Sequence, residues 1–115
     1  MRFAVAVDLA DPAPERVMDA AIPWVVSDGG TLDALYVEGT RFAADWVSDP
    51  LIRRVVDREA EVVQRAEIGR LNELLSRVPE AHRGHPRLLT GNPVVALVEA
   101  GQDYGALLVA THGRA

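Results

Sequence analysis

The sequence predicts an α/β fold: an open parallel sheet with helices on both faces. Short, fully apolar runs alternate along the chain with longer segments whose apolar residues have helical spacing. Asp-Pro or Asn-Pro pairs also stand where two of the helices are expected to begin. Alternation of this kind is typical of parallel strands joined by right-handed crossovers. We therefore expect the element order β-α-β-α-β-α-β.

The first strand is expected at residues 3–7, Phe-Ala-Val-Ala-Val, and ends at Asp8. A run without polar residues is typical of a strand that is buried on both faces. Residues 11–15 form a turn into a helix, which should end at Gly29. The apolar stripe of this helix consists of Val17, Met18, Ala21, Trp24 and Val25. This spacing predicts that Trp24 packs in the core.

A second strand at residues 31–37 is followed by a loop and a long helix. The loop carries Phe42 and Trp46, which we expect to cover the end of the sheet; the alternative is that they close over a ligand or line a partner surface. Asp49 is suited to cap a helix that begins at Pro50, and the sequence predicts that this helix extends to Val78. Its apolar stripe is Ile52, Val56, Ala60, Val63, Leu71, Leu74, Leu75 and Val78.

Residues 79–86 are expected to form a polar turn that contains His82 and His85. Two histidines without a nearby third ligand favour a solvated turn over a metal site. A short strand at 87–90 follows. Asn92 then caps a helix that carries Val94 to Ala100 and ends near Gly101, and the last strand is expected at 106–110.

Composition excludes several classes of function. The 115 residues suffice for one domain, and 49% hydrophobic with 25% charged residues is typical of a globular protein. A net charge of -5 argues against nucleic acid as a partner. There is no cysteine, and all 12 basic residues are arginine, which excludes thiolate metal sites, P-loops and Schiff-base lysines. We find neither a signal peptide nor a membrane-spanning run, so we expect a cytoplasmic protein.

Three stretches together resemble the universal stress protein (UspA-like) family. They are the first strand ending in Asp8, the turn Gly91-Asn92-Pro93 before a helix, and residues 106–114, Ala-Leu-Leu-Val-Ala-Thr-His-Gly-Arg. The resemblance covers the whole chain as one domain, residues 1–115. It implies strand order 3-2-1-4, with a further helix and a fifth strand that this chain lacks. In the family the fifth strand commonly pairs two subunits, so the resemblance also implies a homodimer.

In members that bind nucleotide, ATP with Mg²⁺ occupies the crevice between strands 1 and 4. The resemblance implies that this crevice is formed here by Asp8, Val37, Ala110, Thr111, His112 and Gly113. Val37 matches the position whose backbone lies near adenine. The family's phosphate motif is Gly-x2-Gly-x9-Gly-Ser/Thr, in which glycines let backbone N–H groups approach the phosphates. Ala110 replaces its first glycine, Gly113 matches the second, and the rest would follow Ala115.

Three functions remain open at this point. The first is a regulatory or sensory stress-response module that binds ATP and is not a turnover enzyme. The second is a nucleotide-free dimerising module, which the replacement of glycine by Ala110 favours. The third is slow ATP hydrolysis, for which the sequence offers no recognisable general base. Two explanations also remain open for the missing part of the motif: the chain continues, or the protein is short.

Overall fold

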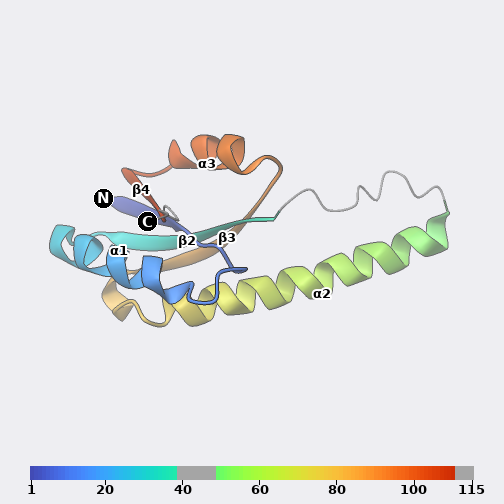
Figure 1. The fold of residues 1–115 in the computed structure, drawn as a ribbon, viewed down its shortest axis with the longest axis horizontal. Helices are drawn as coiled ribbons and strands as arrows, with labels where there is room; N and C mark the ends of the chain where they lie inside the picture. Colours follow the sequence, from blue (N-terminus) through green and yellow to red (C-terminus); the bar gives the residue numbers. More distant parts are fainter. Residues whose placement is uncertain (39–48, 111–115) are drawn as a thin grey trace.

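The computed structural model describes residues 1–38 and 49–110. Their four strands form a parallel sheet in the order β3-β2-β1-β4 (Figure 1). The predicted strand order is therefore confirmed. Along the chain the elements are β1 Arg2–Ala6, α1 Glu15–Asp28, β2 Thr31–Glu38, α2 Pro50–Leu75, the 3₁₀ helix η2 Glu80–His82, β3 Arg83–Thr90, α3 Pro93–Gly101 and β4 Ala106–Val109.

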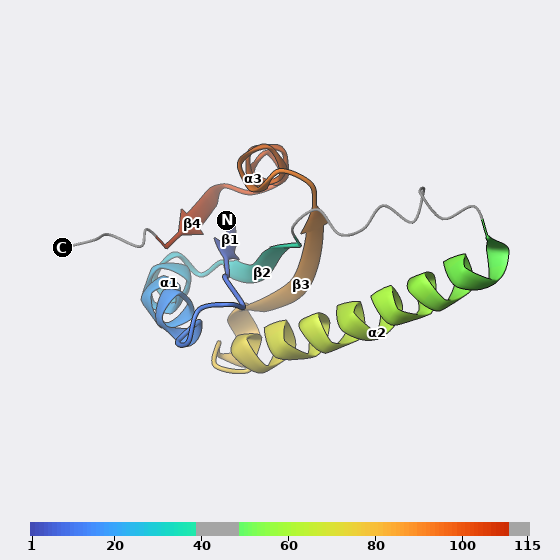
Figure 2. The same cartoon turned by 45° about the vertical axis from the view of Figure 1, so that its right-hand side comes forward.

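Helices cover both faces of the sheet, as predicted. Helices α1 and α2 lie on one face and α3 lies on the other (Figure 2). The core on the α1–α2 face is built on Val5, Met18 and Leu71. The smaller core under α3 joins Ala4, Leu35 and Ala100. Successive strand residues point to opposite faces, so an uninterrupted apolar strand supplies both cores at once.

The predicted helix ends are formed by their capping residues. Oδ1 of Asp49 accepts the N–H of Leu51 at 2.9 Å. Oδ1 of Asn92 accepts the N–H groups of Val94 and Val95 at the start of α3. Gly29 ends α1 with a φ of 79°, a left-handed conformation that glycine adopts without steric cost.

The third strand begins earlier than the sequence predicted. β3 starts at Arg83, so His85 and Pro86 lie in a strand rather than in a polar turn. Proline in a strand usually indicates a break, but β3 is an edge strand and tolerates the missing N–H. His82 lies in η2, where its Nδ1 is 2.8 Å from the carbonyl oxygen of Gly30. Within residues 1–38 and 49–110, no three potential ligand side chains are grouped to hold a metal ion.

Two further expectations are wrong. Trp24 is 69% exposed instead of buried. It precedes the buried Val25 by one residue and is therefore rotated by about 100° from it around the helix, away from the sheet. Helix α2 ends at Leu75 rather than at Val78, although Val78 is still buried beneath the sheet.

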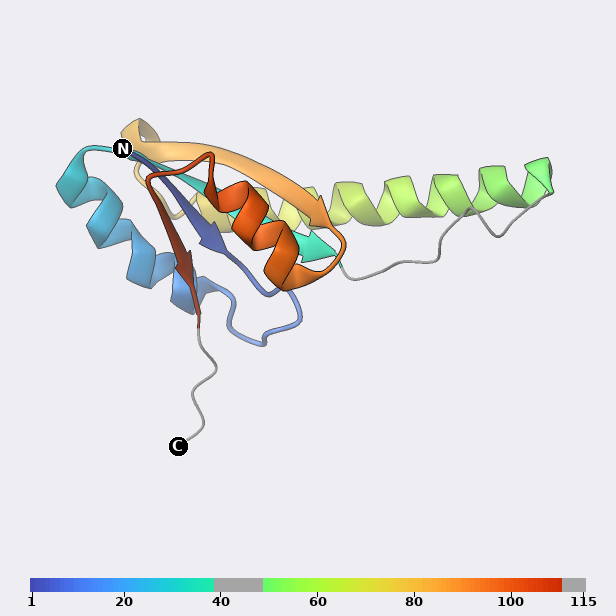
Figure 3. The ribbon, with the colours of Figure 1, turned by 90° about the horizontal axis from the view of Figure 1, so that it is seen from above.

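Only the C-terminal part of α2 is anchored in the core. Leu71, Leu74 and Leu75 are buried, whereas Leu51, Val55 and Val62 are exposed. Figures 1 and 3 show the first turns of α2 extending beyond the sheet. No helix of the described residues is both long enough and apolar enough to span a membrane. Phe42 and Trp46 lie outside the described residues.

Candidate functional site

A cavity of about 620 Å³ lies where the carboxyl ends of β1, β2 and β4 meet the first turns of α1 and α3. The strand order reverses between β1 and β4, and ligands of open parallel sheets bind at such a reversal. The lining consists of Ala6, Val7, Asp8, Asp11, Ala13, Pro14, Arg16, Val17, Leu35, Tyr36, Val37, Pro93, Leu97, Val109 and Ala110. Its volume is in the range of small-molecule sites.

Asp8 lies at this cavity because β1 ends just before it. The N–H of Val7 donates to the carbonyl oxygen of Leu35 at 2.8 Å, and the chain then leaves the sheet. The Asp8 side chain is exposed, and its Oδ1 accepts the N–H of Ala10 at 2.9 Å. Asp8 therefore caps the loop after β1 and also lines the cavity.

Val37 lines the cavity where β2 continues past the end of β1. Pairing between β1 and β2 ends at Ala6 and Leu35, and Val37 lies two residues further along β2. Peptide groups of a strand alternate between its two neighbours, so Val37 directs its peptide groups to the same side as Leu35. On that side β1 has already left the sheet, so we expect the peptide groups of Val37 to face the cavity that this residue lines.

Ala110 follows β4 directly and forms the opposite wall of the cavity. Ala6 and Val109 are register partners, so Ala110 stands just past the last paired residues of β1 and β4. Three predicted site residues, Asp8, Val37 and Ala110, thus line a single cavity although they are far apart in the sequence. The other three, Thr111, His112 and Gly113, lie outside the described residues.

Sequence reasoning missed several residues of the lining. Asp11 and Arg16 come from the loop after β1 and the first turn of α1, and Oδ1 of Asp11 accepts the N–H of Ala13 at 2.8 Å. Pro93 and Leu97 come from the start of α3. The predicted topology could have identified these residues, because the first turns of helices that follow parallel strands face the carboxyl edge of the sheet.

The lining combines apolar walls with a few acceptors. Val17, Leu97 and Val109 offer apolar surface, and the carboxylates of Asp8 and Asp11 accept hydrogen bonds. Arg16 is the only cationic side chain among the described lining residues. Such a cavity suits a small ligand that combines apolar surface with hydrogen-bond donors.

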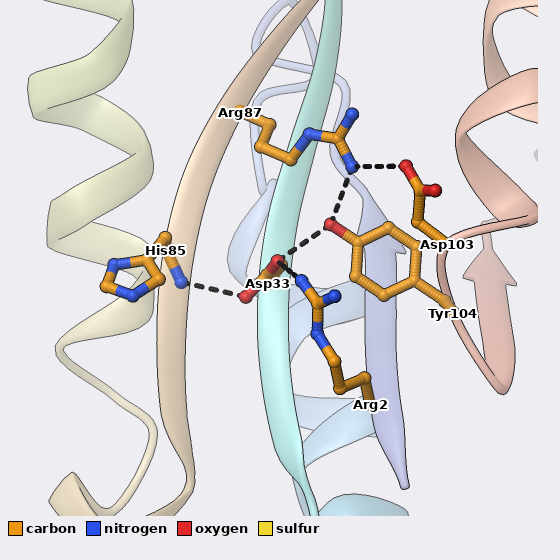
Figure 4. Close-up of polar contacts among 6 residues, drawn as sticks. All are labelled: Arg2, Asp33, His85, Arg87, Asp103 and Tyr104. Atoms are coloured by element: carbon orange, nitrogen blue, oxygen red, sulfur yellow. Dashed lines mark hydrogen bonds and ion pairs between the residues drawn. The ribbon is translucent and has the colours of Figure 1, made fainter.

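A second group of polar side chains lies at the opposite, amino edge of the sheet (Figure 4). Asp33 of β2 is 5% exposed and accepts the hydroxyl of Tyr104 at 2.7 Å and the N–H of His85 at 2.9 Å. The guanidinium groups of Arg2 and Arg87 lie over the Tyr104 ring, 5.1 and 5.7 Å from its centroid. These contacts join β1, β2 and β3 to the loop before β4, so the group is structural.

Burial raises the pKa of the Tyr104 hydroxyl, and the acceptor Asp33 raises it further, against the opposing effect of Arg87. Because the folded pKa is raised, the stabilisation by Tyr104 is complete below its unfolded pKa of about 10 and is lost only at more alkaline pH. The phenol therefore remains a donor to Asp33 throughout the neutral range.

Comparison with known proteins agrees with this architecture. No model of a known protein family matches the sequence, and no curated protein matches the chain. Among solved structures, the chain is similar to a protein from the universal stress protein family from Burkholderia pseudomallei, with a TM-score of 0.64 and 22% identity. The superposition covers 96% of this chain and 81% of the other. The chain therefore has the fold of the universal stress proteins.

Proposed function

We propose that the chain is a regulatory module of the universal stress protein family that binds an adenine nucleotide, ATP with Mg²⁺, in the cavity between β1 and β4. One observation carries the proposal. Asp8, Val37 and Ala110 come from three different strands and line one cavity at the reversal of strand order.

The chemistry of the lining is compatible with such a ligand. The adenine ring would lie against the apolar wall near Val37, whose peptide groups can pair with the edge of the base. The ribose hydroxyls would donate to the carboxylate of Asp8. The phosphates would lie towards Ala110 and the residues that follow it. Mg²⁺ would neutralise part of the phosphate charge. This matters because the described lining carries two carboxylates, of Asp8 and Asp11, and one arginine, Arg16.

Calorimetric titration of the full chain with ATP and Mg²⁺ tests the proposal. We expect saturable binding, and we expect Asp8→Ala to weaken it by about 10- to 100-fold, because a hydrogen bond to a charged group is lost. Asp8→Asn keeps an acceptor for the Ala10 N–H but removes the charge. Comparing Asp8→Asn with Asp8→Ala therefore separates the effect of the lost charge on ligand binding from the effect of the lost loop cap. Asp103→Ala, at the amino edge, is the matched control and should leave the affinity unchanged. Absence of heat with the unmodified chain would refute the proposal.

A second candidate is a nucleotide-free module of the same fold, and Ala110 favours it. A Cβ at this wall takes space that a glycine would leave to the phosphates. If the cavity binds ATP despite Ala110, Ala110→Gly should raise the affinity by about two- to tenfold, a small effect of local crowding. If the unmodified chain binds nothing and Ala110→Gly creates binding, the second candidate is correct.

Slow ATP hydrolysis is the weakest of the three functions. Within the described lining, the ionisable groups that could accept a proton are the carboxylates of Asp8 and Asp11. Both lie in a loop and accept backbone N–H groups, which stabilises them as capping groups of that loop. We therefore propose a sensor or switch rather than a turnover enzyme.

A further inference from the structure

The N-terminal two thirds of α2, residues 50–67, expose an apolar face to solvent. Leu51 is 70% exposed, Val55 is 59% exposed and Val62 is 62% exposed. Their spacings of four and seven residues place them on one side of the helix. Ile52 and Val63 extend the same face and are also exposed. None of this surface is needed to anchor α2, because Leu71, Leu74 and Leu75 do so further along.

A groove follows this face, and the described residues that line it all belong to α2. Its lining consists of Leu51, Arg54, Val55, Arg58, Glu59, Val62 and Val63. An apolar strip of this kind, in which charged residues such as Arg58 and Glu59 alternate with the apolar ones, is typical of a helix that pairs with another helix.

The charges along this segment divide into two blocks of opposite sign. Residues 50–58 contain three arginines and one aspartate, a net charge of +2. Residues 59–67 contain three glutamates and one arginine, a net charge of -2. A parallel pair of such helices would place like charges side by side. An antiparallel pair would place each basic block against the acidic block of the other helix.

We infer that this face of α2 pairs with the same face of a second copy of the chain, antiparallel, about a two-fold axis between Arg58 and Glu59. In that register Val55 packs against Val62 of the second copy. Arg58 lies beside Glu59 of the second copy, and the symmetry forms the same ion pair twice. The apolar contact and the charge complementarity thus select the same alignment.

The association should be reversible. Eighteen helical residues span about 27 Å, so the contact buries less than the ~800 Å² per partner of a standard interface. We therefore expect a dimer that dissociates on dilution. The site lies far along α2 from the nucleotide cavity and the experiments below contain no nucleotide, so their outcome is independent of the proposed function.

Cysteine cross-linking tests both the contact and its direction, since the chain has no cysteine of its own. Val55→Cys mixed with Val62→Cys should give a disulfide-linked dimer on mild oxidation. Either variant alone should not, because seven residues separate each position from its copy, about 10 Å along the axis and beyond disulfide reach. Gln64→Cys mixed with Val55→Cys is the matched control, since Gln64 is exposed and lies about 180° around the helix from Val55.

Three results would overturn the inference. Cross-linking of Val55→Cys with itself would indicate a parallel pair, and equal yields in all mixtures would indicate random collision. A chain that sediments as a monomer at every concentration, with no cross-link in any mixture, would show that this face does not pair with a second copy.

Charge exchange provides an independent check by sedimentation equilibrium. Arg58→Glu and Glu59→Arg should each raise the dissociation constant by about fivefold, because each substitution removes both symmetric ion pairs and a single exposed pair contributes little. The double variant restores opposite charges across the axis and should recover the original constant to within about twofold. Failure of the double variant to recover would contradict the proposed register. Because these side chains are on the helix surface, circular dichroism should report an unchanged fold.

Discussion

Replacing Asp33 by alanine is expected to lower the free energy of unfolding by about 3 kcal/mol, and the melting temperature of a chain of this size by about 12 °C. The carboxylate accepts hydrogen bonds from the Tyr104 hydroxyl and the His85 N–H, and alanine leaves both donors without this acceptor. Chemical denaturation, followed by circular dichroism, measures the change. A loss below about 1 kcal/mol would contradict the structural role assigned to Asp33.

Asp103→Ala is the matched control in the same group. Asp103 is exposed, and its ion pair with Arg87 is long, at 3.4 Å, so its removal should cost less than about 0.5 kcal/mol. The close packing around Asp33 also explains a neighbouring glycine. A Cβ on Gly84 would overlap the Asp33 carboxylate and approach the carbonyl oxygen of Leu32 to 2.5 Å.

Leu71→Ala should also destabilise the fold by about 3 kcal/mol, because a fully buried side chain leaves a cavity between α2 and the sheet. The measurement is the midpoint and slope of urea denaturation. The loss should appear in the midpoint, with an unchanged slope, since the fold itself is retained.

Leu51→Ala makes the same chemical change in the same helix, at a position that is 70% exposed. We expect a change of at most about 0.5 kcal/mol, measured on dilute protein so that association does not contribute. Equal effects of the two substitutions would show that the N-terminal part of α2 is buried in the folded chain, contrary to the structure.

Most of the fold could be predicted from the sequence, because its signals are local. The caps at Asp49 and Asn92 and the glycine that ends α1 are formed by the expected residues. The errors arose where tertiary context decides. Pro86 is tolerated because β3 is an edge strand, and Trp24 is exposed because its side of α1 faces away from the sheet. Neither fact is encoded within a few residues of those positions.

The candidate site could be predicted only in part. The position of Asp8 after an apolar strand, together with the strand order that the family resemblance implies, was sufficient to place it in the cavity beside Ala110. Arg16 and Leu97 were missed for a different reason. Apolar spacing identifies the helices that carry them, but it does not indicate which part of the molecule the first turns of those helices face. The exposed face of α2 was missed for a related reason. Residues such as Ile52 and Leu71 belong to one periodic pattern, but only Leu71 has a sheet to pack against.

The proposal that the cavity between β1 and β4 binds nucleotide is tested most directly by the backbone amide resonances of the full chain, recorded while ATP and Mg²⁺ are added. The account predicts that the amides that shift belong to Asp8, Val37 and Ala110 and to their neighbours at the carboxyl edge of the sheet, while those of His85 and Tyr104 at the amino edge stay in place. Shifts confined to the amino edge, or none at saturating nucleotide, would contradict it.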